Sequence, residues 1–298
     1  MKRKFDVKMA LITVSAVAAL SLGSTAFADT FVLQGNYLKV GVSNSGGLID
    51  DNFAAGIDYA INGDAAWTGY DVLKPGTPFQ FYSIGAAGTW GAAGYLNGNT
   101  FSATTTNTSS GDVLSAVTTG TYGALSFSQV LSFNRDSGVI YFTTSLTNTG
   151  NTTLSDVVYA TGFDPDQDVY AGGWYDTVNT IGTNRVVAYA PVTGWGAAIV
   201  GNGVMSVSRW WDQNPYNLYN GGVNFSDGDG DNTINMAWLL GEMDAGQTYQ
   251  INYQYALGTD ESGNSAVPEP STLLLLGAGL AGLGLARRRF GSLSTKRR

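Results

Sequence analysis

Apolar residues recur at every second position in the middle of the chain. Leu125, Phe127, Leu131 and Phe133 share one side of this pattern with Gln129, and mostly small or polar residues occupy the positions between them. A period of two is typical of a β-strand that buries one face. No segment of the chain body has a sustained helical period with capping residues. We therefore predict an all-β protein.

The segments that follow this strand predict a three-stranded antiparallel meander. Residues 134–138 carry a turn signal before a second strand at 139–146, and residues 147–151 carry another before a third strand at 154–160. Gly and Asn in these turns tolerate the positive φ angles that tight turns require.

Other short strands are separated by Gly, Asn and Asp turns. They are expected at 36–42, 79–84, 112–118, 185–190, 196–200, 204–209, 232–240 and 248–257. Many short strands without a repeat of fixed period favour an antiparallel β-sandwich. No Pro/Ser linker divides the body, so residues 29–258 are predicted to form one domain, followed by a polar stalk at 259–265.

The absence of two residue types excludes whole classes of chemistry. The 298 residues include no Cys and no His. Disulfides, thiolate zinc sites, iron–sulfur clusters, Ser-His-Asp triads and imidazole metal sites are therefore impossible. Residues 29–267 contain five cations against 21 acids, a net charge of −16. Such an acidic body cannot neutralise a run of phosphates, which excludes nucleic acid as a partner.

The N-terminus has the three parts of a secretory signal. A basic start at residues 1–4 precedes an apolar run at 9–22, and Ala26 and Ala28 form a small-x-small cleavage site. We predict a signal helix in residues 1–28 that engages the Sec translocon and is cleaved after Ala28. The alternative, a membrane anchor, needs about 20 apolar residues, more than this run offers.

The C-terminus combines a Pro-Glu-Pro, an uncharged apolar stretch and an arginine cluster, in that order. They are Pro268, Glu269 and Pro270, then residues 273–286, then Arg287, Arg288 and Arg289. The apolar stretch predicts a single transmembrane helix whose flanking arginines stay on the cytoplasmic side. The alternative is an ordinary tail anchor that is not processed.

These three parts resemble the PEP-CTERM sorting signal, here spanning residues 266–290. The resemblance implies an exported protein that is anchored transiently in the membrane. A membrane protease, exosortase, then releases or transfers it to the cell surface or the extracellular space. One departure is the basic cytoplasmic tail at 291–298, which is longer than usual past the arginines.

A second, weaker resemblance concerns residues 146–150 and 163–168. They are similar to secreted domains with a galactose-mutarotase-like fold, which implies a supersandwich form of the β-sandwich. The catalytic His of mutarotases has no counterpart in this chain. Their reaction is therefore not expected here.

Two acidic segments have the D-x-D-x-D spacing that lets carboxylates converge on a hard cation such as Ca²⁺. The candidate ligands are Asp164, Asp166 and Asp168 in the first acidic segment and Asp227, Asp229 and Asp231 in the second. The second segment departs from an EF-hand loop, because Asn232 replaces the glycine and Trp238 replaces the bidentate Glu. A calcium site would need ligands from elsewhere, including the other segment. The alternative is a pair of solvated acidic turns.

Aromatic residues lie close to both acidic segments in the sequence. Trp174 and Tyr175 follow the first, and Trp210 and Trp211 precede the second. Aromatic faces beside amides and carboxylates suit carbohydrate, so these four are candidate glycan-binding residues. The alternative is that they belong to the core of the sandwich.

These patterns favour a non-catalytic binding or structural role with exopolysaccharide, assisted by calcium. The competing hypothesis is a polysaccharide-modifying enzyme with Asp/Glu chemistry, which needs no His. Only Glu242 and Glu261 are available as Glu in residues 29–267, and no motif pairs an acid with a nucleophile. A third possibility is a passive surface-coat component.

Overall fold

The computed structural model describes residues 30–61, 63, 71–94, 101–209, 211–221 and 228–260. Several predicted features lie outside these residues: the signal helix, the helix at 273–286, the sorting residues, Trp210 and Asp227. In the described part of the chain, no helix is both long enough and apolar enough to span a membrane.

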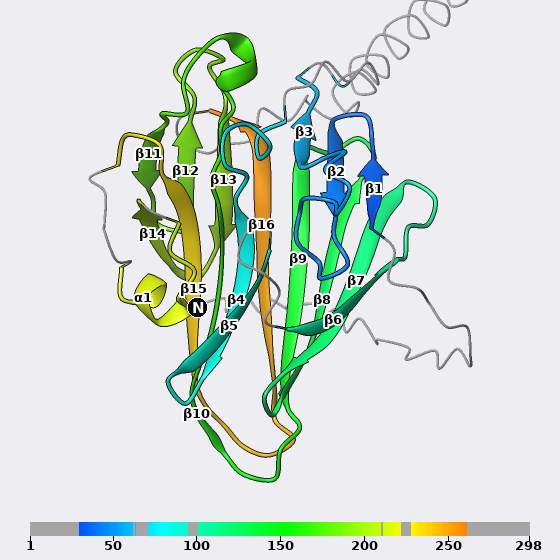
Figure 1. The fold of residues 1–298 in the computed structure, drawn as a ribbon, viewed down its shortest axis with the longest axis vertical. Coiled ribbons are helices and arrows are strands. Elements are labelled where there is room, and N and C mark those ends of the chain that lie inside the picture. The colour runs from blue at the N-terminus through cyan, green and yellow to red at the C-terminus, as the bar shows by residue number, and fades with distance from the viewer. Residues whose placement is uncertain are drawn as a thin grey trace, which may run out of the picture.

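The larger of two extended sheets, here called the large sheet, is antiparallel throughout (Figure 1). Its strands, in spatial order, are β11 (Val178–Ile181), β12 (Arg185–Tyr189), β13 (Gly196–Gly201), β16 (Thr248–Thr259), β9 (Val139–Asn148), β8 (Leu125–Asn134), β7 (Val113–Tyr122) and β6 (Ser102–Asn107). Thr259, the first residue of the predicted stalk, is the last residue of β16 and is buried.

The second sheet, here called the facing sheet, is also antiparallel. Its order is β14 (Val204–Ser208), β15 (Thr233–Met243), β10 (Leu154–Phe163), β4 (Gln80–Ala86) and β5 (Thr89–Gly94). A small third sheet contains β1 (Phe31–Gln34), β2 (Leu38–Val42) and β3 (Ile57–Tyr59). The described helices are one turn of 3₁₀ helix, Val169–Ala171, and α1 (Pro215–Tyr219). The prediction of an antiparallel all-β protein is confirmed.

The large and facing sheets pack against each other through apolar and tyrosine side chains. The hydroxyl groups of Tyr159 on β10 and Tyr253 on β16 lie 2.9 Å apart. The rings of Phe163 on β10 and Tyr255 on β16 have centroids 4.7 Å apart. Both pairs connect the two sheets. Burying such rings supplies most of the stabilisation of a core like this one.

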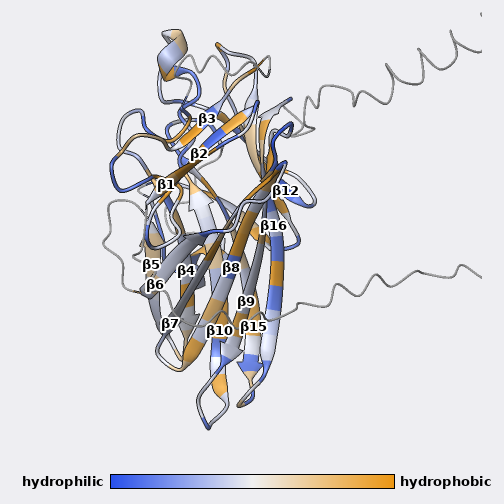
Figure 2. Cartoon of the chain, turned by 90° about the vertical axis from the view of Figure 1, so that its right-hand side faces the viewer, coloured by the Kyte–Doolittle hydropathy of each residue, from blue (hydrophilic) through white to orange (hydrophobic). Residues whose placement is uncertain are grey.

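The strand that revealed the period-two pattern is β8. Its residues alternate between buried and half-buried along nearly its whole length, so one face lies in the core. Apolar and polar residues alternate along the long strands in the hydropathy view (Figure 2). This is the behaviour expected of a sheet with one buried face.

The predicted meander is wrong in its third strand. β8 pairs with β9 as expected, but the next neighbour of β9 in the large sheet is β16. β10 crosses to the facing sheet, where it lies between β15 and β4. Residues 157–163 of β10 are all buried. One face of β10 packs on the large sheet, and its other face is covered by α1, whose buried Leu218 belongs to the same apolar cluster as Ala160. This second cover explains why the strand lacks the alternation of a sheet with one buried face.

Candidate metal centre

The two acidic segments meet in space. Carboxylate oxygens of Asp164, Asp166 and Asp231 all lie within 4.8 Å of one another. We call these residues the acidic trio. Two come from the first acidic segment and one from the second, so ligands from both segments meet at one site. Within the residues that the structure describes, no other group of three or more acidic side chains converges in this way.

The end of β10 positions the first acidic segment. Asp164 directly follows Phe163, the last residue of this strand, and its backbone N–H donates to the carbonyl of Phe79 at 3.0 Å. The backbone N–H of Asp166 donates to the carbonyl of Val72 at 2.8 Å. The segment is therefore held by the chain that leads into β4, the neighbour of β10.

The start of β15 positions the second segment. Thr177 and Gly230 form an isolated antiparallel bridge, with an N–H to carbonyl bond of 3.0 Å in each direction. Asp231 follows this bridge, and β15 begins two residues later at Thr233. Since β10 and β15 are neighbours and antiparallel, the end of one strand lies beside the start of the other. This register brings Asp231 to Asp164.

Burial leaves part of the acidic trio without partners. Asp164 and Asp166 are 3% and 2% exposed, and the Oδ1 atom of each has no hydrogen-bond partner. Asp231 is exposed and forms the solvent side of the cluster. A buried carboxylate without compensation is expensive, because ionisation in a low dielectric is unfavourable. The arrangement therefore favours either protonation or a bound cation.

The same burial changes the titration of the acidic trio. Desolvation is the main cause that raises the pKa of Asp164 to about 7, against an opposing hydrogen bond from Trp211. Desolvation, followed by the nearby charges of Asp164 and Asp231, raises the pKa of Asp166 to about 10. The pKa of Asp231 is also raised, by desolvation first and by Asp176 second. Perturbation of three adjacent acids is typical of functional sites.

Trp211 contacts the acidic trio directly. Its indole Nε1 donates to Oδ2 of Asp164 at 2.6 Å, and its ring centroid lies 6.3 Å from that of Phe79. The φ angle of Trp211 is 53°, in the left-handed region that a bulky residue rarely adopts. The half-buried Trp211 thus supports a carboxylate, a role for which the sequence carries no signal.

The other predicted ligands lie outside the acidic trio. Asp168 accepts hydrogen bonds from the backbone N–H groups of Val192 and Thr193, both at 2.7 Å. Its carboxylate therefore fixes a loop. Asp229 is exposed. The structure brings together one carboxylate of the second segment with two of the first.

Trp174 and Tyr175 form an exposed aromatic pair. Trp174 is 76% exposed, and its ring lies 6.5 Å from that of the half-buried Tyr175. An indole this accessible is free to stack on a ligand, so its role in glycan binding stays a prediction.

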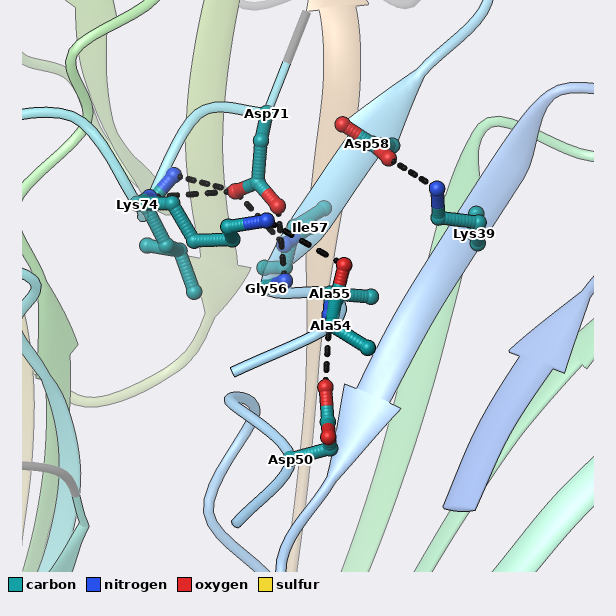
Figure 3. A network of polar contacts seen from close by, with 10 residues as sticks. Lys39, Asp50, Ala54, Ala55, Gly56, Ile57, Asp58, Asp71 and Lys74 are labelled. Carbon is teal, nitrogen blue, oxygen red and sulfur yellow. Dashed lines mark hydrogen bonds and ion pairs between the residues drawn. The ribbon is translucent and has the colours of Figure 1, made fainter. Parts of the chain in front are cut away.

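A different set of aspartates has a structural role (Figure 3). The carboxylate of buried Asp71 accepts backbone N–H bonds from four residues at 2.7–3.2 Å; they are Gly56, Ile57, Leu73 and Lys74. Nearby, Asp58 forms a 2.7 Å ion pair with Lys39. Desolvation still raises the pKa of Asp71, with the charge of Asp58 second. With its oxygens occupied by N–H donors, Asp71 tethers the small sheet to the segment before β4.

Comparison with protein families identifies one motif. Residues 266–289 match the PEP-CTERM protein-sorting motif. The chain is therefore an exported protein that is sorted by exosortase, a membrane protease, as the sequence resemblance implied. Among curated proteins, no sequence matches this chain.

Comparison with solved structures finds enzymes that act on carbohydrates, at very low sequence identity. A bacterial glucoamylase complexed with acarbose has a TM-score of 0.50 at 10% identity, over 80% of this chain and 33% of the glucoamylase. A galactose mutarotase related enzyme from Lactobacillus acidophilus has a TM-score of 0.42 at 11% identity, over 78% of this chain and 99% of that enzyme. An alpha-mannosidase from Enterococcus faecalis V583 has a TM-score of 0.42 at 12% identity, over 80% of this chain and 30% of the mannosidase. At this identity the glucoamylase comparison concerns the fold alone.

Proposed function

We propose that this exported chain is a non-catalytic protein of the cell surface or extracellular matrix that binds exopolysaccharide and holds a calcium ion in its acidic trio. The observation that carries the calcium part of the proposal is the burial of Asp164 and Asp166 with one unpartnered oxygen each. A small ion can reach such oxygens from the side of Asp231. A polymer cannot.

The acidic trio favours calcium because of its donors. Ca²⁺ takes six to eight oxygen ligands, carboxylates among them, in a flexible geometry. Two buried carboxylates at this distance repel each other when both are ionised, and a divalent ion removes that repulsion. A chain without disulfides also gains stability from an ion that binds only its folded state.

Burial argues against the competing hypothesis, a polysaccharide-modifying enzyme with paired carboxylates. In glycoside hydrolysis, both carboxylates must reach the atoms of the scissile bond. Asp164 and Asp166 are closed to a sugar ring in this structure. The same closure suits an ion whose role is to brace the loops at the ends of β10 and β15.

Calcium would also act on the long-range electrostatics. The net charge of −16 in residues 29–267 repels an acidic polysaccharide. A divalent ion in the acidic trio lowers this charge, and on the solvent side, at exposed Asp231, it offers a bridge to an anionic polymer. Calcium therefore fits both the stability of the domain and its retention in a polysaccharide matrix.

The calcium part is tested by thermal unfolding of the purified chain with millimolar Ca²⁺ or with EDTA. Calcium is expected to raise the Tm of the wild type and to leave that of Asp231→Asn unchanged. Asp229→Asn is the matched control, because Asp229 belongs to the same segment but lies outside the acidic trio. Equal loss of the calcium effect in both variants, or no effect in the wild type, would contradict the proposal.

The binding part is tested with exopolysaccharide from the producing cells. The chain is incubated with the polymer in Ca²⁺ or EDTA, and samples are separated by size-exclusion chromatography over time. Co-elution of protein with a polymer of constant size supports binding. A polymer peak that moves to smaller size over time would instead establish an enzyme, and two unchanged peaks would leave a passive coat component.

A further inference from the structure

A cavity of about 540 Å³ opens between the two extended sheets, and none of its lining residues belongs to the acidic segments. Its walls come from β13 and β16 of the large sheet and from β15 of the facing sheet, which lie near one another in Figure 1. We call it the notch. Its volume falls in the range of about 300–1,000 Å³ that is usual for small-molecule sites. No pattern in the sequence pointed to it.

The notch exists because two neighbouring strands differ in length. The last pair between β13 and β16 is Gly201 with Tyr253. β16 extends beyond this pair to Thr248, where β9 is its partner on the opposite side. In the described residues, the sheet is therefore open beside Gln250 and Asn252. Trp238 of β15 lines this opening from the facing sheet.

The chain after β13 is fixed against Trp238. The indole Nε1 of Trp238 donates to Oδ1 of Asn202 at 3.0 Å. A Cβ atom at Gly201 would lie 3.3 Å from the indole, and one at Gly203 would lie 2.7 Å from it. Both glycines therefore permit a close approach of the backbone to the Trp238 indole. This approach places Asn202, the residue between them, at the opening of the notch, here called its rim.

Amide side chains surround the notch, and none of its lining residues is charged. The amides are exposed and belong to Asn184, Asn202, Gln250 and Asn252. Oδ1 of Asn202 accepts from an indole and Oδ1 of Asn184 accepts from Nε of Arg185, at 3.3 Å. Indole and guanidinium groups can only donate, which fixes both amides with their NH₂ groups as the remaining donors. Oδ1 of Asn252 accepts from Thr143 at 2.9 Å.

The lining below this rim is apolar. Trp238 and Ile251 are buried and Leu240 is half-buried. The notch thus combines an apolar floor with neutral hydrogen-bond donors around the opening. A pyranose has the matching chemistry, since its C–H face is apolar and its hydroxyl oxygens accept hydrogen bonds. An acidic sugar finds no cation among the lining residues and meets a body of net charge −16.

We propose that the notch binds uncharged sugar units of the exopolysaccharide, with Asn184 and Asn202 as hydrogen-bond donors to hydroxyl oxygens. This inference rests on the proposed function and names the place and the chemistry of binding. It differs from the sequence-based hypothesis, in which Trp174, Tyr175, Trp210 and Trp211 are the glycan contacts. The two sites lie on different segments and can be separated by substitution.

The test measures binding of the chain to a panel of uncharged and acidic oligosaccharides and to the exopolysaccharide. Asn202→Asp keeps the acceptor for the Trp238 indole and replaces the NH₂ donor with a carboxylate oxygen. Loss of this neutral NH₂ donor is expected to weaken the binding of uncharged sugars by about tenfold or more and to leave the Tm unchanged. Asn184→Asp, which keeps the acceptor for Nε of Arg185, is expected to act in the same direction.

The matched control is Asn151→Asp, the same chemical change in the exposed loop between β9 and β10. It is expected to bind as the wild type does. If both notch variants bind exopolysaccharide as the wild type does, the notch proposal is wrong but the proposed function stands. The same conclusion follows if Trp174→Ala loses binding while the notch variants keep it. If the wild type binds only acidic oligosaccharides, the notch proposal is likewise wrong. If the wild type binds no carbohydrate at all, the proposed function fails together with it.

Discussion

The indole Nε1 of Trp211 donates a 2.6 Å hydrogen bond to Oδ2 of Asp164. This bond occupies Oδ2 of Asp164, while Oδ1 has no hydrogen-bond partner. It also opposes the rise in the pKa of Asp164 that burial causes. Trp211 therefore favours the ionised form of this carboxylate, the form that a cation requires.

Trp211→Phe is predicted to lower stability and to weaken calcium binding. Phe keeps the ring beside Phe79 but removes the N–H group, so a buried carboxylate loses its partner. The expected loss is about 1–3 kcal/mol in the free energy of unfolding, measured by chemical denaturation.

The matched control for this variant is Trp195→Phe. Trp195 is buried, and its Nε1 has no hydrogen-bond partner in the structure. Its replacement removes a similar volume but no bond. If both variants lose the same stability and calcium response, the bond to Asp164 contributes nothing specific.

Without calcium, stability is predicted to fall as the pH rises. The folded-state pKa values of Asp164 and Asp166, about 7 and about 10, lie above the unfolded value of about 3.9. The folded state therefore holds these protons more tightly. For each group the free energy of unfolding decreases by up to about 1.4 kcal/mol per pH unit from about pH 4 to its folded pKa.

This pH dependence is measured by thermal unfolding in EDTA at several pH values between 4.5 and 8. Asp166→Asn, which cannot ionise, is expected to have a shallower slope than the wild type. Calcium should raise the Tm more at pH 7 than at pH 5, because the ion binds only deprotonated ligands. A wild-type Tm that rises with pH in EDTA would contradict the assigned titration.

Asp71→Asn is predicted to be strongly destabilising. The carboxylate of Asp71 accepts four backbone N–H bonds, and an amide offers only one oxygen and turns an NH₂ group towards the remaining donors. The expected loss is about 3 kcal/mol in chemical denaturation. Asp112→Asn is the comparison, because the exposed carboxylate of Asp112 forms a 3.8 Å ion pair with Arg135 at the surface. The free energy of unfolding of Asp112→Asn should fall by less than about 1 kcal/mol.

The N-terminal signal and the sorting motif together predict the two ends of the mature chain. The intact mass of the exported protein should correspond to a chain that starts after Ala28 and ends near Pro270. Glu269→Ala should retain the C-terminus through Arg298. Glu261→Ala, a nearby change outside the motif, should be processed as the wild type is. A wild-type mass that includes Arg298 would mean that this tail is not cleaved.

The sequence by itself determined the fold class, the export route and the residue types available for chemistry. Each follows from local information: the alternation along β8, the Pro-Glu-Pro at 268–270 before an apolar stretch, and the absence of His and Cys. It also marked both acidic segments, because D-x-D-x-D spacing is visible without a fold. Strands such as β6 escaped prediction, since a run of Ser, Thr and Asn at an edge has little apolar pattern.

Tertiary structure alone decided which of these residues meet. The crossing of β10 into the facing sheet places Asp164 beside the start of β15, and so chooses Asp231 over Asp229 and leaves Asp168 to a loop. The notch likewise depends on β13 ending before β16 does. Local periodicity reports which face of a strand is buried. The choice of neighbouring strand depends on burial summed over both sheets, which no short segment encodes.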